Sequence, residues 1–291
     1  MNYLIIGGTG TLGTELVSQL SEDRANNITI YSRGELKQQK LKQAFPHVRC
    51  IIGDVRDREA LRQAIQGQDA VFHMAAIKHI DVAEQNPLEA VKTNFLGTVN
   101  VAEEAIAAGI KWVVFSNTDK AVLPITTYGY TKALAQNYLL NLNITQEITR
   151  FSAFGWGNVL ASRGSVIPSF VKSLKEKKSV CITDARMSRF WITIEAAASF
   201  MISNFKTASL TKTMVPPIKG ASVVRVAETV AKAMRIKDYD VSYIGLRGTE
   251  KLYEVLESTH DGCHRSDTCE QYTDDDLFNL LEPIVTQELT A

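Results

Sequence analysis

Short apolar runs alternate with amphipathic stretches through the first half of the chain. The runs are rich in Ile, Val and Phe and predict buried strands, whereas the stretches between them repeat their apolar positions at helical spacing. This alternation predicts an α/β fold, a Rossmann-like doubly wound parallel sheet with helices on both faces. The expected strands are 2–6, 28–32, 48–52, 69–74, 111–116 and 145–151, and the expected helices are 11–24, 34–44, 57–66, 86–108 and 125–142.

The pattern becomes looser after about residue 152, where glycines cluster and Pro216-Pro217 interrupts the chain. Helical spacing returns at 223–235, 248–257 and 274–281. The division expected from these changes is a sheet domain over 1–154, with 190–218 returning to it, and a smaller C-terminal region over 155–189 and 219–291.

Composition excludes several classes of protein. The 291 residues include 32 Lys+Arg and 32 Asp+Glu, and this balance argues against a nucleic-acid or membrane-surface partner. No apolar run is long enough to span a bilayer. Scattered cysteines without an export signal predict a cytoplasmic protein with reduced thiols. His260, Cys263, His264 and Cys269 match no standard zinc spacing, so no metal site is expected.

A glycine-rich turn joins the first expected strand to the first expected helix. Gly7, Gly10 and Gly13 form a Gly-x-x-Gly-x-x-Gly pattern at this point. Glycines allow a tight turn and a close approach of a pyrophosphate, which the N–H groups of the helix N-terminus attract. The pattern therefore predicts that the sheet domain binds a dinucleotide.

The ends of the next strands indicate which dinucleotide is bound. An NAD site usually has a carboxylate after the second strand, but this chain has Ser32 and Arg33. A hydroxyl and a cation suit a 2′-phosphate, which favours NADP, although Arg33 in a solvated loop would give the same sequence. Asp54 can meet the adenine amino group, and Ala75 and Ala76 leave room for the cofactor.

Residues 116–132 contain the groups that best indicate chemistry. Asp119 and Lys120 are adjacent, and Tyr128 lies one helical turn before Lys132. A lysine near a tyrosine lowers the pKa of the phenol by charge attraction. The resulting tyrosinate can take the proton of a substrate hydroxyl while hydride leaves the carbon that bears this hydroxyl. A neighbouring carboxyl and amine could then serve as acid and base in an elimination.

These motifs resemble the extended, sugar-nucleotide-modifying branch of the short-chain dehydrogenase/reductase superfamily. The chain is most similar to the inverting UDP-N-acetylglucosamine 4,6-dehydratases of pseudaminic acid biosynthesis. It departs from their pattern at 155–158, 247–251 and Gly34. The segments that carry the resemblance are 54–57, 75–79, 86–87, 92–94, 118–121, 157–158, 162–166, 184–192 and 250–254.

The resemblance implies an NADP-dependent lyase that removes water from a nucleotide sugar. Tyr128, helped by Thr118 and Lys132, would oxidise carbon 4 of the sugar. Lys120 would then take the proton from carbon 5, and Asp119 would protonate the departing hydroxyl of carbon 6. The family also implies a homo-oligomer. Alternatives are a nucleotide-sugar epimerase or 4-ketoreductase, which need no Asp-Lys pair, and a non-catalytic NADP-binding protein.

The resemblance also assigns binding residues to both regions. In this interpretation 1–154 is the NADP-binding Rossmann domain, and the C-terminal region binds the substrate. The expected NADP-binding residues are Gly7, Thr9, Gly10, Thr11, Leu12, Gly13, Ser32, Arg33, Asp54, Val55, Ala75, Ala76, Lys78, Asn94, Tyr128 and Lys132. The expected substrate-binding residues are Lys78, His79, Asn158, Arg163, Arg189, Arg247 and Glu250, with Arg186 as a further candidate.

Overall fold

The computed structural model describes residues 1–160, 162, 165–259 and 262–290. The chain divides into two compact units. Unit 1 contains Met1–Gly155 and Glu195–Pro216, and unit 2 contains Trp156–Ile194 and Pro217–Ala291. Across the described ranges, no helix is both long and apolar enough to cross a membrane.

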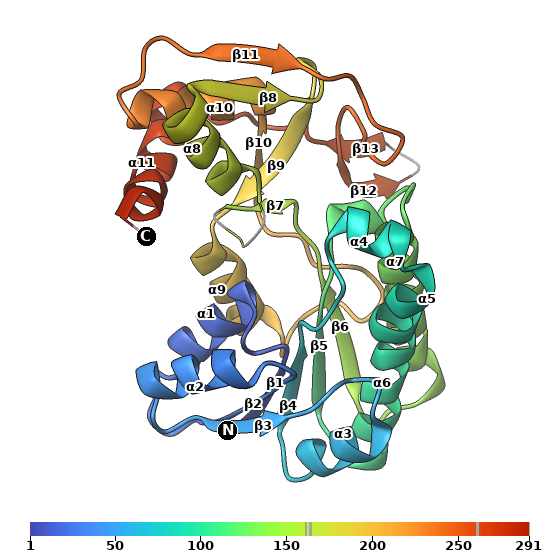
Figure 1. The fold of residues 1–291 in the computed structure, drawn as a ribbon. Helices are drawn as coiled ribbons and strands as arrows, with labels where there is room; N and C mark the ends of the chain where they lie inside the picture. Colours follow the sequence, from blue (N-terminus) through green and yellow to red (C-terminus); the bar gives the residue numbers. More distant parts are fainter. Residues whose placement is uncertain (161, 163–164, 260–261, 291) are drawn as a thin grey trace. The chain divides into compact units, whose positions relative to one another are not determined.

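Unit 1 contains a six-stranded sheet in the order β3-β2-β1-β4-β5-β6, and every pair in it is parallel (Figure 1). The order reverses direction between β1 and β4, which is where doubly wound sheets bind ligands at the carboxyl ends of the strands. The Rossmann-like fold expected from the sequence is thereby confirmed. The strands are β1 Asn2–Ile6, β2 Asn27–Ser32, β3 Arg49–Ile52, β4 Ala70–His73, β5 Trp112–Ser116 and β6 Arg150–Phe154.

Helices cover both faces of this sheet (Figure 1). Most of them follow the connections that the apolar spacing predicts, but the long fourth stretch is divided into α5, the π-helical turn η1 and α6. The helical elements of unit 1 are α1 Thr11–Leu20, α2 Glu35–Ala44, α3 Arg58–Ile65, α4 Ile80–Gln85, α5 Pro87–Ala90, η1 Val91–Leu96, α6 Gly97–Ala107, the 3₁₀ turn η2 Asp119–Ala121, α7 Thr127–Thr145 and α9 Ile194–Asn204.

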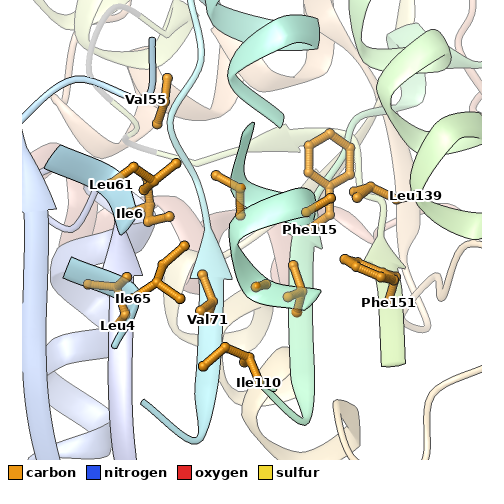
Figure 2. Close-up of a cluster of buried hydrophobic side chains, with 14 of the residues drawn as sticks. Leu4, Ile6, Val55, Leu61, Ile65, Val71, Ile110, Phe115, Leu139 and Phe151 are labelled. Carbon is orange, nitrogen blue, oxygen red and sulfur yellow. The ribbon is translucent and has the colours of Figure 1, made fainter. Parts of the chain in front are cut away.

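One face of the sheet packs against α3, α6 and α7. Leu4, Ile6 and Val71 point from β1 and β4 into the same cluster as Phe115 and Phe151 from β5 and β6 (Figure 2). These side chains are completely or almost completely buried, and burial of this kind stabilises the fold by about 25 cal/mol per Å² of apolar surface.

The segment that returns from residue 195 covers the opposite face. Phe205 follows α9, and its ring lies 5.4 Å from that of Phe72, with edge-on geometry. Gln19 of α1 donates to the carbonyl oxygen of Glu195 at 3.1 Å, which holds the start of α9 beside α1. Met214 forms a bridge with Phe154 at the end of β6. The packing of this face of the sheet therefore depends on residues that are distant in sequence.

Unit 2 is built from small sheets and three helices within its described part. β9 lies between β10 and β7, β8 pairs with β11, and β12 pairs with β13. Apolar side chains of α8, α10 and α11 pack around Trp191. The elements are β7 Asn158–Val159, α8 Val166–Lys177, β8 Ser179–Ile182, β9 Ser188–Ile192, β10 Lys219–Ser222, α10 Val223–Ala233, β11 Asp240–Tyr243, β12 Val255–Thr259, β13 Gly262–Arg265 and α11 Asp274–Thr290.

Three elements differ from the sequence-based expectation. The sixth strand begins at Arg150, because α7 continues to Thr145 through the residues expected to start it. The helix expected over 248–257 does not form, and its last three residues belong to β12. The return to unit 1 begins at Glu195 instead of residue 190, because β9 pairs with β7 and β10 in unit 2.

Candidate active site

The glycine-rich turn lies where the strand order reverses. Gly7 has a φ of 83°, and a Cβ there would lie 2.8 Å from the backbone nitrogen of Ala75. A Cβ at Gly13 would lie 2.5 Å from the carbonyl oxygen of Gly7. Both positions therefore require glycine. α1 begins after Gly10 without a side-chain cap, as expected of a helix N-terminus that receives a phosphate.

The end of β2 presents a hydroxyl whose acceptor positions are occupied. The Ser32 hydroxyl accepts hydrogen bonds from the Thr9 hydroxyl at 3.2 Å and from the Gln38 amide at 3.0 Å. A serine hydroxyl has one proton and two lone pairs, so its proton remains for donation to a ligand. Arg33 is 61% exposed and lies 3.7 Å from Asp54. A hydroxyl donor and an exposed cation fit a phosphate group.

Asp54, the expected adenine contact, is held by a neighbouring arginine. Arg56 donates to its two carboxylate oxygens at 3.0 and 2.7 Å. These hydrogen bonds lower the pKa of Asp54, so the carboxylate is ionised at neutral pH. Val55, which follows it, is buried against Gly97 at the start of α6.

Asn94 braces the segment after β4 against α7. Its amide oxygen accepts from the backbone N–H of Ile77 at 2.7 Å, and its amide nitrogen donates to the carbonyl of Ile77 and to the Thr131 hydroxyl, both at 3.0 Å. Asn94 lies in η1, and such π-helical turns are frequent at functional sites. Both amide protons of this expected cofactor residue are thus used within the protein.

Tyr128 and Lys132 lie in the first turns of α7. Burial raises the pKa of Tyr128 to about 12, while the Lys120 charge and a hydrogen bond with Thr118 act in the opposite direction. Burial lowers the pKa of Lys132 to about 7. The Lys132 amine donates to the carbonyl oxygen of Ser116 at 2.5 Å and lies 3.7 Å from the centre of the Phe115 ring. The Lys120 charge therefore lowers the phenol pKa, a contribution that the sequence pattern did not identify, and the help expected from Lys132 stays a prediction.

Asp119 and Lys120 form a largely buried pair beside this tyrosine. The Asp119 side chain is 0% exposed and that of Lys120 is 22% exposed, and the Lys120 amine lies 2.9 Å from Asp119 Oδ1. They belong to η2, whose N-cap is Thr118. The pair is thus enclosed, unlike an ion pair in a surface loop.

Thr118 connects the two parts of the site. Its hydroxyl donates to Asp119 Oδ1 at 3.1 Å and also hydrogen-bonds Tyr128. A threonine hydroxyl has one proton, so it cannot donate to the carboxylate and to a tyrosinate together. Loss of the tyrosine proton is therefore coupled to the hydrogen bonding of Asp119.

The other expected substrate residues lie apart from this cluster along the chain. Lys78 and His79 are exposed before α4 in unit 1. In unit 2, Asn158 lies in β7 and Arg247 is exposed, while Arg186 is bound by the Asp184 carboxylate. Arg163 lies outside the described residues.

Arg189 and Glu250 have more definite surroundings in unit 2. Arg189 is buried, donates to the carbonyls of Ser188 and Leu252, and lies 3.9 Å from Glu254. Glu250 accepts from Thr183 at 3.5 Å through one oxygen, while its other oxygen is buried without a partner among the described residues. The sequence is equally compatible with Glu250 as the cap of a helix, but no helix begins there, and the unpartnered oxygen suits a ligand hydroxyl.

Two residues that matter for the site were not identified from the sequence. Glu84 of α4 accepts from the Thr127 N–H at 2.6 Å and from its hydroxyl at 3.1 Å, and so fixes the first residue of α7. Gly129, the third residue of α7, packs against the backbone of Lys120. A glycine inside a helix destabilises that helix by about 1 kcal/mol relative to alanine. A glycine within the expected helix 125–142 was therefore the sign in the sequence that another part of the chain packs closely there.

Comparisons with known proteins identify the family of this chain. The family described as polysaccharide biosynthesis protein matches residues 3–275. This chain belongs to that family. A UDP-N-acetylglucosamine 4,6-dehydratase (inverting) from Campylobacter jejuni is 40% identical over 266 residues, which cover 89% of this chain and 78% of the relative. This match confirms the resemblance inferred from the sequence.

Two further proteins are similar to this chain over most of its length. A UDP-glucose 4-epimerase from Rickettsia massiliae is 34% identical over 278 residues, covering 92% of this chain and 81% of the relative. The X-ray structure of Pen from Bacillus thuringiensis has a TM-score of 0.91 and 33% identity, covering 99% of this chain and 98% of the other.

Proposed function

We propose that this protein is an NADP-dependent sugar-nucleotide 4,6-dehydratase, and that UDP-N-acetylglucosamine is its substrate, with inversion at carbon 5. The observation that carries this proposal is the enclosed Asp119–Lys120 pair, joined through Thr118 to Tyr128. Epimerases and ketoreductases need the tyrosine but not the pair. The 40% identity with an inverting dehydratase supports the same conclusion.

The glycine-rich turn and Ser32 fit a dinucleotide, and Arg33 supports NADP. A bound NADP would supply the acceptor for the hydride of carbon 4 and the hydride that is returned at carbon 6. Tyr128 acts as the base for the hydroxyl proton on carbon 4. Its raised pKa requires help, which Thr118 and Lys120 provide by stabilising the tyrosinate.

The acid–amine pair performs the elimination. Moving one proton across the 2.9 Å contact converts an ammonium–carboxylate pair into an amine and a carboxylic acid without a change in net charge. The Lys120 amine takes the proton from carbon 5, and the electrons of that C–H bond form the C5=C6 double bond. The hydroxyl on carbon 6 leaves with the Asp119 proton as water, and a proton is later returned to carbon 5 from the opposite face.

The reaction is tested with UDP-N-acetylglucosamine in deuterated water without added reductant. The expected product is a 4-keto-6-deoxy sugar nucleotide with one deuterium at carbon 5, identified by mass and NMR. Steady consumption of NADPH, or a product without deuterium at that carbon, contradicts the proposal.

Lys120→Ala separates the dehydratase from other enzymes of this fold. The variant should lose at least about 100-fold in the rate of water loss, because a general base contributes about 10²–10⁴-fold. Lys92→Ala, which removes an exposed lysine paired with Glu89, should retain wild-type turnover. Wild-type turnover by Lys120→Ala would exclude Lys120 from the reaction.

Arg33→Glu tests the cofactor. The variant should weaken NADP binding at least about tenfold and leave NAD binding less affected, because only NADP has the 2′-phosphate. Fluorescence titration with both dinucleotides measures the ratio. Equal losses would contradict the preference for NADP.

An epimerase is the second candidate, favoured by the 34% identity with a UDP-glucose 4-epimerase. An epimerised product has the mass of the substrate, so product mass distinguishes the two reactions. A homo-oligomer also stays a prediction, which sedimentation velocity would test. The expected substrate contacts at Lys78, Asn158, Arg189 and Arg247 remain predictions as well.

A further inference from the structure

A buried glutamine of α2 faces the ends of β2 and β3. Gln38 is only 5% exposed, although its neighbours Lys37 and Gln39 are exposed. Its side-chain amide nitrogen donates to the carbonyl oxygens of Ser32 and Ile51 at 2.9 and 2.8 Å, and to the Ser32 hydroxyl at 3.0 Å. Ser32 is the last residue of β2, so this amide lies at the edge of the sheet where doubly wound folds bind their ligands.

These contacts fix which end of the Gln38 amide faces Ser32. A carbonyl oxygen can only accept a hydrogen bond, and two of the three partners are carbonyl oxygens. The amide must therefore present its nitrogen, and the Ser32 hydroxyl must accept from it. The Thr9 hydroxyl donates to the same Ser32 oxygen at 3.2 Å. Both lone pairs of the serine are then occupied, and its proton is directed away from Gln38.

A hydroxyl held in this way differs from an ordinary serine. A free serine hydroxyl rotates and either donates or accepts, whereas the Ser32 hydroxyl can only donate. The 2′-phosphate of NADP has charged oxygens that accept, and a hydrogen bond to a charged oxygen is about twice as strong as one between neutral groups. The 2′-hydroxyl of NAD offers only a neutral acceptor. A fixed donor at the end of β2 therefore favours the phosphorylated dinucleotide.

We propose that Gln38 is a specificity-determining residue that holds the Ser32 hydroxyl as a donor for the 2′-phosphate of NADP. This inference rests on the proposed use of NADP. Gln38 is a positioning residue, since it acts through Ser32. If it served only to join α2 to β2 and β3, its loss would weaken the binding of NADP and NAD alike.

Gln38→Met removes the amide and keeps a side chain of similar length. The Ser32 oxygen then has an unoccupied lone pair, and its hydroxyl is free to rotate away from the ligand. Fluorescence titration of the whole chain with NADP and with NAD measures each Kd. The variant should bind NADP about tenfold more weakly and NAD less than about threefold more weakly, because only the hydrogen bond to a charged oxygen is a strong one.

A double-mutant cycle with Ser32→Ala separates this role from a structural one. Ser32→Ala should cause the same selective loss of NADP affinity. Adding Gln38→Met to Ser32→Ala should change the ratio of the NADP and NAD Kd values by less than about twofold, because both residues act through one hydroxyl. Additive changes in this ratio, or equal weakening of NADP and NAD by Gln38→Met, would overturn the inference.

Gln39→Met is the matched control, because it makes the same change at the next residue, where the side chain is exposed. It should leave both Kd values unchanged. Gln38→Asn withdraws the amide by one carbon and should shift the ratio in the same direction as Gln38→Met. If urea denaturation shows that neither Gln38 variant folds, Gln38 is a structural residue and the inference fails. A wild-type protein that binds NAD as tightly as NADP would instead overturn the proposed cofactor.

Discussion

At the scale of single residues, the function of each group depends on its partners more than on its type. Lys132 and Lys120 are both lysines near one tyrosine, yet burial lowers the pKa of Lys132 to about 7, and its amine is directed to Ser116. Lys120 instead pairs with Asp119, and its charge lowers the pKa of Tyr128. The sequence identified these residues but could not show that Lys120 lies close enough to act on the phenol, because that depends on a turn formed before α7.

Thr118→Val should move the pH dependence of activity toward higher pH. The hydrogen bond with Thr118 lowers the pKa of Tyr128, so its loss raises that pKa and less tyrosinate is present at neutral pH. The rising limb of kcat/KM against pH measures the effect, and at neutral pH we expect a loss of about tenfold or more. Thr118→Ser restores the hydroxyl and should restore the limb. An unchanged limb in the valine variant would refute the assigned role.

At the scale of elements, connections decide which residues meet. The first five strands of unit 1 could be predicted to within one residue, because continuous apolar runs followed by helical spacing leave few alternatives. The division of the stretch 86–108 into α5, η1 and α6 could not, since the π-helical turn is stabilised by Asn94 contacting residues distant in sequence. The short strands of unit 2 were missed for the same reason, because they pair with distant segments.

Asn94→Ala should lower the free energy of unfolding by about 2 kcal/mol, because it removes two hydrogen bonds to the partly buried backbone of Ile77 and one to the buried Thr131 hydroxyl. Urea denaturation measures the change. Asn86→Ala removes an exposed hydrogen bond to Val82 in the same stretch and should change stability by less than about 0.5 kcal/mol. Equal changes in the free energy of unfolding for the two substitutions would show that the Asn94 hydrogen bonds do not stabilise η1.

At the scale of the whole molecule, one buried histidine links stability to pH. The His73 ring is bonded to the Thr98 hydroxyl, which itself donates to the carbonyl of Asn94, so the ring nitrogen is the donor. Burial, with a smaller effect of the Lys132 charge, lowers the pKa of His73 from 6.5 to about 3. Between these values the unfolded chain binds a proton that the folded protein does not, so stability falls as the pH falls.

His73→Leu should therefore make the acid side of the stability curve shallower. The slope between pH 6 and pH 4 should decrease by up to about 1.4 kcal/mol per pH unit, which corresponds to one proton. Urea denaturation at several pH values gives the slope. His47→Leu removes an exposed histidine and should leave it unchanged. The prediction fails if both variants have the wild-type slope.

The return of 195–216 to unit 1 has a consequence for how the protein is made. All six strands have been synthesised once the ribosome has added Gly155, but the residues that seal one face, Phe205 and Met214, follow only after a further part of unit 2. Until then the nascent chain exposes Phe72 and Phe154. Fragments that end near Gly155 are therefore expected to aggregate through this exposed apolar face.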